Sequence, residues 1–141
     1  MRNAPRVHRR PKPPGRSVRQ IARKNTNAKS NVNRDEEVRR LYDKRWAETS
    51  REFRKEYPAC VLHFKKGMVV LPEVVDHWIP HKGDSQLFWD PENWVPLCKS
   101  CHDGPKRRIE LAWSNGAPIT QRPKLITIDM IAEFVIHGRG N

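Results

Sequence analysis

The residues best suited to chemistry lie in one stretch of the chain, from Asp76 to His102. Within it are an Asp-His pair at residues 76–77, an asparagine at position 93, and a C-x-x-C followed directly by histidine at residues 98–102. These side chains are the usual metal ligands and proton carriers of proteins. Their density predicts a metal-dependent active site, which the rest of the chain braces or presents to a substrate.

A second group of ligands combines the C-x-x-C with a C-x-x-H upstream. Its members are Cys60, His63, Cys98 and Cys101. Two pairs with this spacing can supply four tetrahedral ligands to one zinc ion, each pair through a tight turn. A closed set of four ligands predicts a structural zinc site that ties the two segments together. The alternative is that the cysteines are buried hydrophobic residues and His63 lies at the surface.

Asp76, His77 and His102 match the needs of phosphodiester hydrolysis. Such a site requires a base to activate water, a cation to stabilise charge on the phosphate, and a group that orients the base. Neutral imidazole accepts a proton near pH 7, which suits His77. Asp76 and His102 can hold a divalent ion that stays open to water and substrate, as Mg²⁺ prefers. Because adjacent strand residues point in opposite directions, Asp76 and His77 can both serve only at a bend.

Several neighbouring residues have more than one interpretation. His81 is a loop residue, a phosphate contact or a third metal ligand, and we favour the first two. A basic group at the end of the stretch either contacts the DNA backbone or forms a solvated helix face; it comprises Lys99, Lys106, Arg107 and Arg108. We expect three tryptophans to pack in the core rather than stack on bases, namely Trp78, Trp89 and Trp94.

The elements that position these residues can be placed from periodicity and stop signals. We expect an amphipathic helix of about 20 residues that begins at a capping box of Asn33 and Glu36 and ends at Pro58; its aromatic stripe suits a core better than a base-stacking surface. Strands are expected at residues 69–75, with Asp76 and His77 at the end, and at Trp94 to Leu97. A helix should begin at Pro105. Thr127 should cap a last helix that ends at Gly138 and buries Ile128, Ile131, Ala132, Val135 and Ile136.

Charge is distributed very unevenly along the 141 residues. Residues 1–34 hold 11 of the 28 Lys and Arg and none of the 16 Asp and Glu, which leaves 17 basic and 16 acidic residues elsewhere. A self-repelling arm of this kind is expected to be disordered alone and to track phosphates. Its candidate contacts are Arg9, Arg10, Arg16 and Arg19. The alternative is a solubilising tail.

Length and cysteine content indicate the number of domains and the cellular compartment. The length suits one domain, and a small core with 36% hydrophobic residues often needs a staple. No apolar run is long enough for a signal peptide or a membrane span. Three cysteines cannot all pair, so we expect a reduced cytoplasmic compartment in which a metal replaces disulfides.

At residues 40–110 the chain resembles the HNH endonuclease family, in the form found in phages and prophages. The resemblance rests on VVDHWIPH, GDSQLFWDPENW and LCKSCH, in that order, after a lead-in of LYDKRW and YPAC. It implies a small α+β fold, a ββα-metal finger stapled by structural zinc. In it one strand delivers Asp76 and His77, the second Asn93, and the helix His102. Asn93 would fix the strand-loop geometry that aims His77, although it could be only a turn residue.

Composition and periodicity divide the chain into segments, and the resemblance implies cofactors and partners for the middle one. We expect a basic arm at 1–34, a nuclease domain at 35–116 and a C-terminal loop and packing helix at 117–141. The substrate would be double-stranded DNA, the catalytic ion Mg²⁺, Mn²⁺ or Ni²⁺, and phage packaging proteins are possible partners. His63 replaces the usual cysteine, and Gly104-Pro105 interrupts the usual helix after His102. The rival interpretation is a zinc-knuckle module that binds DNA or RNA without cleaving it.

Overall fold

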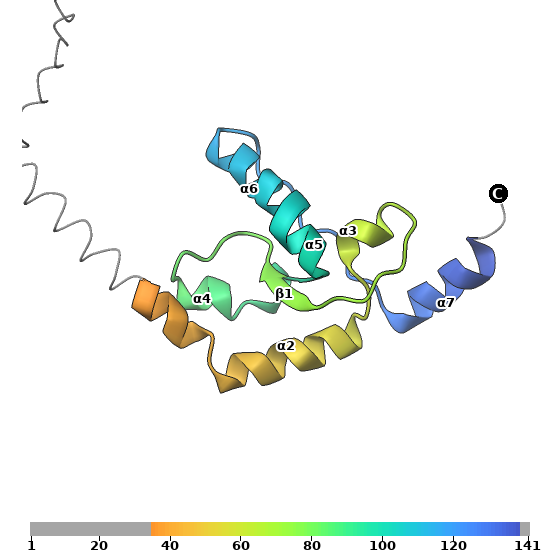
Figure 1. Cartoon of the computed structure of the whole chain (residues 1–141), viewed down its shortest axis with the longest axis horizontal. Coiled ribbons are helices and arrows are strands. Elements are labelled where there is room, and N and C mark those ends of the chain that lie inside the picture. Colours follow the sequence, from red (N-terminus) through yellow and green to blue (C-terminus); the bar gives the residue numbers. More distant parts are fainter. Residues whose placement is uncertain (1–34, 139–141) are drawn as a thin grey trace, which may run out of the picture. The chain divides into compact units, whose positions relative to one another are not determined.

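The computed structural model describes residues 35–138, and the chain from Glu36 onward forms one compact unit (Figure 1). The predicted basic arm, with Arg9, Arg10, Arg16 and Arg19, lies outside the described residues, as does Asn33 of the predicted capping box. Within residues 35–138, the helices are all too short or too polar to cross a membrane.

The leading helix is broken, where the sequence predicted one continuous helix. Residues 36–41 are helical, the chain bends at residues 42–43, and helix α2 runs from Lys44–Glu56. The Asp43 carboxylate accepts a hydrogen bond of 2.9 Å from the backbone N–H of Trp46 and so caps α2. An aspartate forms such a cap readily, and the new start competes with continuation of the helix.

A two-stranded antiparallel sheet lies at the centre of the unit. Strand β1, Val74–His77, pairs with β2, Trp94–Leu97, with Asp76 opposite Val95 and His77 opposite Trp94. The predicted second strand is confirmed, whereas residues 69–73 are not in a strand. Between the strands lie helix α4, Ser85–Phe88, and a 3₁₀ turn (η1), Pro91–Asn93.

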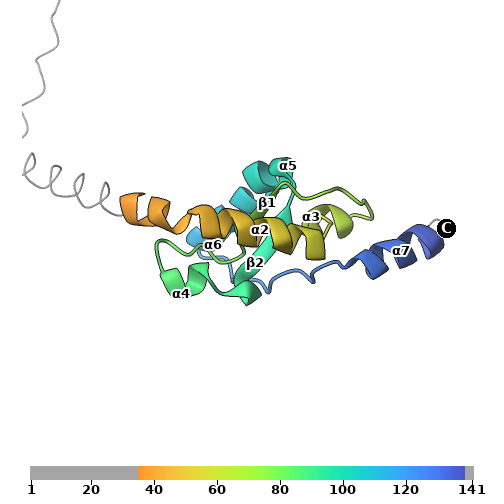
Figure 2. The ribbon, with the colours of Figure 1, turned by 90° about the horizontal axis from the view of Figure 1, so that it is seen from below.

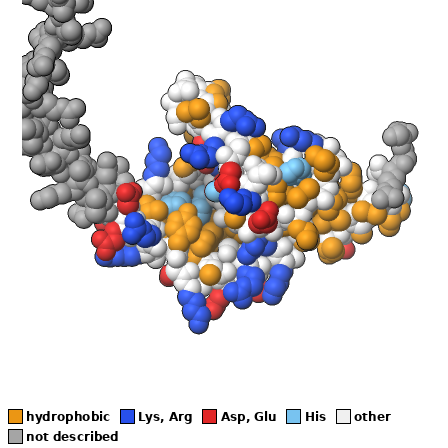
Figure 3. Space-filling model, viewed as in Figure 1, with side chains coloured by type: hydrophobic (Ala, Val, Ile, Leu, Met, Phe, Trp, Pro, Cys, Tyr) orange, Lys and Arg blue, Asp and Glu red, His pale blue; other side chains and the backbone are white. Residues whose placement is uncertain are grey.

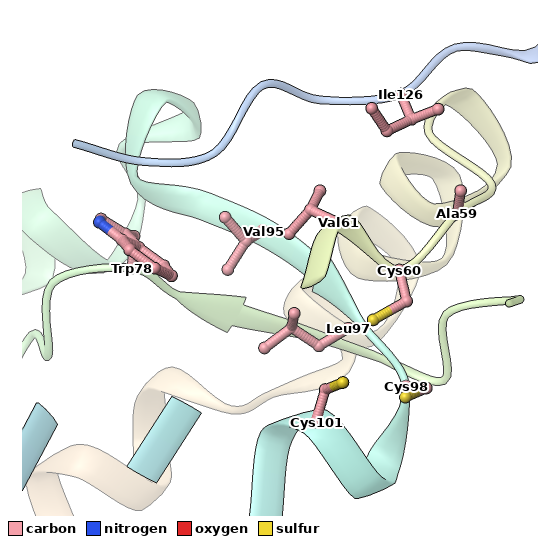
Figure 4. Close-up of a cluster of buried hydrophobic side chains, with 9 residues drawn as sticks. All are labelled: Ala59, Cys60, Val61, Trp78, Val95, Leu97, Cys98, Cys101 and Ile126. Carbon is pink, nitrogen blue, oxygen red and sulfur yellow. The ribbon is translucent and has the colours of Figure 1, made fainter. Parts of the chain in front are cut away.

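The two faces of the sheet pack against different helices. On one face, α2 contributes Trp46 and Phe53 to a cluster with Val75, Phe88 and Trp94. Figure 2 shows α2 lying across the sheet on this side. A second cluster, drawn in Figure 4, packs the three cysteines against two residues of β2, the residue after β1 and three residues from other segments: Val95, Leu97, Trp78, Ala59, Val61 and Ile126.

A helical run follows β2 without interruption. It consists of α5, Lys99–Cys101, a π-helical turn (η2), His102–Lys106, and α6, Arg107–Ser114. The predicted helix therefore starts earlier than Pro105, because the wider π turn accommodates a proline that an α-helix would exclude. This run carries His102 and Lys106.

Two further helices complete the unit. Helix α3, Val61–Phe64, follows Cys60, and α7, Ile128–His137, begins at the predicted cap, Thr127. The predicted buried face of α7 is wrong: Ile128, Ala132, Val135 and Ile136 are exposed. The contact with the core is made instead by Met130, Ile131 and Phe134, because Leu125 and the buried Ile126, just before the helix, pack on the core and constrain its rotation.

Candidate active site and metal cluster

Asp76 and His77 stand at the end of β1 and point to opposite faces of the sheet. The Asp76 carboxylate lies on the side of the helical run, 3.5 Å from Nζ of Lys106. The His77 ring lies on the side of α2, stacked on Trp46 with ring centroids 5.1 Å apart. Both nevertheless line one cavity of about 280 Å³. The end of the strand thus provides the bend that joint action of the two residues requires.

The His77 ring is held by its Nε2 atom. Nε2 lies 2.9 Å from the backbone carbonyl of Phe88, an acceptor, so Nε2 carries the proton and donates it. The other ring nitrogen, Nδ1, is left with a free lone pair. His77 is only 3% exposed, and this burial lowers the pKa of its ring, with the nearby charges of His81 and Lys106 acting in the same direction. The ring is therefore neutral near pH 7, the form in which it can accept a proton.

His102 faces Asp76 from the start of the π turn. Its Nε2 atom is 4.0 Å from Oδ1 of Asp76, and its Nδ1 atom is 2.9 Å from Oδ1 of Asp103. The carboxylate of Asp103 places the proton on Nδ1, which frees the Nε2 lone pair. This carboxylate–histidine arrangement is the one that supports metal-ligating histidines.

The Asp76–His102 couple fits a divalent ion. An ion with bonds of about 2.1 Å reaches two ligand atoms up to about 4.2 Å apart, and Asp76 Oδ1 and His102 Nε2 lie within that span. The two side chains are also partly exposed, which leaves room for water and substrate oxygens. Asp103 was missed in the sequence, although its position next to a candidate ligand was a usable signal.

Lys106 does not have the place predicted for it. Its side chain is 1% exposed, and Nζ donates to the carbonyl of His77 at 3.0 Å and to the carboxylate of Glu110. A buried ammonium cannot reach a phosphate, so the prediction of a nucleic-acid contact for Lys106 is wrong. Its cation instead neutralises Asp76 and Glu110 beneath the cavity. Nothing local in the sequence distinguishes Lys106 from its neighbours Arg107 and Arg108, which are exposed.

Asn93 closes the loop that follows β1. Its side chain is buried, accepts a bond of 2.8 Å from the N–H of Ile79 and donates one of 2.9 Å to the carbonyl of Ile79. Its own carbonyl accepts a bond of 2.6 Å from the N–H of Trp78. These bonds join the start of β2 to the two residues that follow His77.

Cys60, His63, Cys98 and Cys101 form a compact cluster. Their ligand atoms all lie within 4.8 Å of one another, and His63 Nδ1 is 3.3 Å from the sulfur of Cys98 and 3.2 Å from that of Cys101. Figure 4 shows the three sulfurs close together, on Cys60 just before α3, on Cys98 just before α5 and on Cys101 at the end of α5. The cysteines are free and buried, so the predicted convergence of four ligands is confirmed.

The chemistry of this cluster favours a cation. Burial raises the pKa of the Cys101 thiol to about 12, and the hydrogen bond that this thiol donates to Cys98 and the charge of Cys60 act in the same direction. Three thiolates can therefore coexist in this space only if a metal ion compensates their charge. The residues fit such an ion in number, type and distance.

Of the remaining predicted residues that the structure describes, His81 lines the cavity and the others do not. His81 hydrogen-bonds to Tyr42. Lys99 pairs with Asp103 at 2.5 Å, while Arg107 and Arg108 are exposed on α6. Figure 3 shows histidine side chains at the surface with Lys and Arg side chains around them on this face of the molecule. Trp78 and Trp94 are buried, as predicted, and Trp89 is half-buried.

Comparison with known proteins identifies the segment that holds most of these residues. The family model described as HNH endonuclease matches residues 59–108. Searches of curated proteins and of solved structures found no match. The antiparallel strands followed by a helix and the Cys/His cluster are consistent with the ββα-metal fold. The match supports a nuclease-type function, metal binding and a nucleic-acid substrate. Residues 59–108 thus form a domain of the HNH endonuclease family.

Proposed function

We propose that the protein is a metal-dependent DNA endonuclease in which His77 is the general base and a divalent ion is held by Asp76 and His102. The observation that carries the proposal is the arrangement at the end of β1. There the neutral imidazole of His77, with a free Nδ1, and the carboxylate of Asp76 line one cavity, and the same carboxylate faces the imidazole of His102.

Each residue of the site has a separate role in hydrolysis. His77 takes a proton from water at Nδ1 while its Nε2–H bond to the Phe88 carbonyl keeps the ring in place. That carbonyl also favours the charged ring that proton transfer produces. Asn93 holds the loop after His77 and so fixes the base relative to the phosphate. A bound Mg²⁺, Mn²⁺ or Ni²⁺ ion would stabilise charge on the phosphate and on the leaving 3′ oxygen.

The other parts of the proposal concern support and delivery. Zinc in the Cys60, His63, Cys98 and Cys101 cluster would fix the turn that carries His102. Arg107, Arg108 and Lys99, together with the basic arm, would contact the backbone of double-stranded DNA. A cytoplasmic location remains a prediction from the cysteine content, and a phage or prophage context and packaging partners remain predictions from resemblance.

A plasmid-nicking assay tests the catalytic role of His77. Supercoiled plasmid is incubated with the protein and Mg²⁺, Mn²⁺ or Ni²⁺. Because a positioned base contributes at least about 100-fold to the rate, His77→Ala should lose that much. The control is His137→Ala, which removes an exposed histidine at the end of α7. Cleavage by His77→Ala at the wild-type rate would contradict the assignment, whereas plasmid binding without turnover in any metal would favour the zinc-knuckle interpretation.

The metal assignment has its own test. Asp76→Ala and His102→Ala should each lose cleavage, and titration of Mn²⁺ followed by electron paramagnetic resonance should show weaker binding in both variants. His77→Ala should bind Mn²⁺ as the wild type does. Unchanged Mn²⁺ affinity in Asp76→Ala would contradict the assignment of the ion to Asp76 and His102.

A further inference from the structure

The wall of the active-site cavity opposite the helical run carries hydrogen-bond donors that the proposed chemistry does not use. Tyr42, at the break before α2, and Lys82, in the loop after β1, line the cavity that contains Asp76 and His77. His81 lies between them, with its ring centroid 4.7 Å from that of His77. The two segments are distant in sequence, so their convergence here is a product of the fold.

The hydrogen bonds of His81 determine the direction of the Tyr42 hydroxyl. Gly83 donates its backbone N–H to Nδ1 of His81 at 3.1 Å, so Nδ1 is an acceptor and the proton of the neutral ring lies on Nε2. Nε2 is 3.1 Å from the Tyr42 oxygen and donates to it. The phenolic proton of Tyr42 is therefore not used by His81. Among residues 35–138 no other protein acceptor receives it, and it is available to a ligand in the cavity.

Lys82 occupies a position that its own backbone disfavours. Residues 81–84 form a tight turn closed by a bond of 2.8 Å from the Asp84 N–H to the His81 carbonyl. The φ angles of Lys82 and Gly83 are 49° and 91°, which match a type I′ turn. Such turns favour glycine or asparagine at both central positions. Within the described residues Lys82 is the one non-glycine residue with a positive φ. A lysine here carries a conformational cost that glycine would avoid, and this cost points to a use for its ammonium group.

The chemistry of this wall selects an anion with acceptor oxygens. Tyr42 offers a hydroxyl proton and Lys82 an ammonium group, and both are exposed. The nearest carboxylate of the loop, Asp84, is turned away, because it caps α4 by accepting from the N–H groups of Gln86 and Leu87. Asp76 and Glu110 on the other side are held by Lys106.

We propose that Tyr42 and Lys82 bind the non-bridging oxygens of a nucleic-acid backbone phosphate beside His77, and that His81 positions Tyr42. This inference rests on the proposed nuclease function for its substrate. It adds phosphate contacts from Tyr42 and Lys82 to those that the proposed metal ion would make. It also changes the expected part of His81, which would hold the phenol oxygen rather than contact the phosphate itself.

Binding of a labelled DNA duplex to the full chain, followed by fluorescence anisotropy without added divalent metal, tests these contacts. Loss of one hydrogen bond to a charged oxygen should weaken binding by Tyr42→Phe about 10-fold, with no change in salt dependence. Lys82→Gly should weaken binding and lower the slope of log K against log salt by about 0.9, one phosphate contact. Lys82→Gly should also unfold at equal or higher urea concentration than the wild type, since glycine relieves the positive φ.

Two matched controls separate the site from general effects. Tyr57→Phe removes the other tyrosine hydroxyl of the chain, and Lys124→Gln removes an exposed lysine that does not line the cavity. Tyr57→Phe should bind as the wild type does, and Lys124→Gln should weaken binding less than Lys82→Gly. Wild-type affinity in Tyr42→Phe, or equal losses in Lys82→Gly and Lys124→Gln, would overturn the inference.

The outcome can be separated from that of the proposed function. If the wild type cuts plasmid and Tyr42→Phe retains its KM for DNA and its affinity, the phosphate contact is wrong and the nuclease assignment stands. If no metal supports cleavage but both variants bind duplex more weakly by the stated amounts, the contact stands and the nuclease assignment falls.

Discussion

His77 and His81, which line the cavity, and His102, which faces Asp76, differ in which ring nitrogen is free, and these differences set their chemistry. His77 commits Nε2 to the Phe88 carbonyl, whereas His102 commits Nδ1 to Asp103. His81 uses both nitrogens, one toward Gly83 and one toward Tyr42. A free lone pair therefore remains on His77 for a proton and on His102 for a metal ion. No lone pair remains on His81, which favours its interpretation as a loop and positioning residue over that of a third ligand.

The buried environment of His77 should appear in the pH dependence of cleavage. Burial lowers the pKa of the ring from its usual 6.5, with His81 and Lys106 acting in the same direction and Phe88 and Asp76 opposing them. The base works only when neutral, and a lowered pKa keeps it neutral to lower pH. With metal saturating at each pH, kcat/KM should stay level as pH falls through 6.5 and decline only below it. A decline centred above 6.5 would contradict this environment.

Lys106 should contribute more to stability than its surface neighbours. Lys106→Met leaves Asp76 and Glu110 without their shared cation, and breaking a buried ion pair costs about 3–5 kcal/mol. Because both carboxylates are partly exposed, we expect the lower end, about 3 kcal/mol, from urea unfolding. Arg107→Met, on the exposed side of the same helix, should change the free energy of unfolding by at most about 0.5 kcal/mol. Equal effects of the two substitutions would show that the buried cation is dispensable.

At the scale of single elements, the π turn lets the helical run continue through Gly104 and Pro105, which would disfavour an α-helix. Gly104 and Pro105 lie between His102 and Lys106, both of which must face Asp76. A π turn contains one residue more than an α turn, and it relieves the clash between a proline ring and the preceding turn. The extra residue is therefore absorbed locally, and α6 keeps Ile109 and Trp113 on the core.

Deletion of Pro105 tests this account of the helix. Removal of one residue should return the turn to α geometry with His102 and the lysine still on one face, because the bulge and the extra residue disappear together. We expect the free energy of unfolding to be unchanged or higher and Mn²⁺ affinity to stay within about threefold. Deletion of Ala112, in the regular part of α6, is the control. It should destabilise the unit, since the residues on either side rotate by about 100° relative to each other. Loss of Mn²⁺ binding after deletion of Pro105 alone would oppose this account.

Local sequence signals predicted some features well, and they failed where tertiary packing determines the orientation of an element. The spacing of Cys60, His63, Cys98 and Cys101 was sufficient to predict their convergence, because ligand spacing follows from turn geometry. The break before Asp43 could have been read from its capping potential, yet the aromatic periodicity continued across it. The rotation of α7 could not be predicted, since the helix is apolar on several sides and the docking of Ile126 selects one.

The buried place of Lys106 was equally hidden from the sequence. In a run of basic residues, nothing local separates Lys106 from Arg107 or Arg108. Lys106 points inward because the π turn directs it there. The fold also brings the carboxylates of Asp76 and Glu110 to it. The function of a basic residue in such a run is thus set by tertiary structure.

For the whole molecule, the Cys/His cluster connects folding to catalysis. It joins α3 to the turn before α5, and His102 follows Cys101 directly. The buried residues around it form one of the two hydrophobic clusters of the unit. Loss of the ion should therefore remove both the cluster and the orientation of His102, whereas loss of the proposed catalytic ion should leave the fold intact.

Graded removal of metal should separate these two roles. Four-ligand zinc sites bind with apparent free energies of about 10–16 kcal/mol, which equals or exceeds the stability of about 5–15 kcal/mol that is typical of a native protein. Brief treatment with a weak chelator should stop cleavage with no change in near-UV circular dichroism, and added Mg²⁺ or Mn²⁺ should restore it. Prolonged treatment with a strong chelator should abolish the near-UV signal and release one zinc ion per chain. Cys98→Ser should lose the near-UV signal, as after the strong chelator. Asp76→Ala should keep this signal but lose cleavage, as after the weak chelator. A chain that keeps its near-UV signal after losing all metal would show that its core needs no such support.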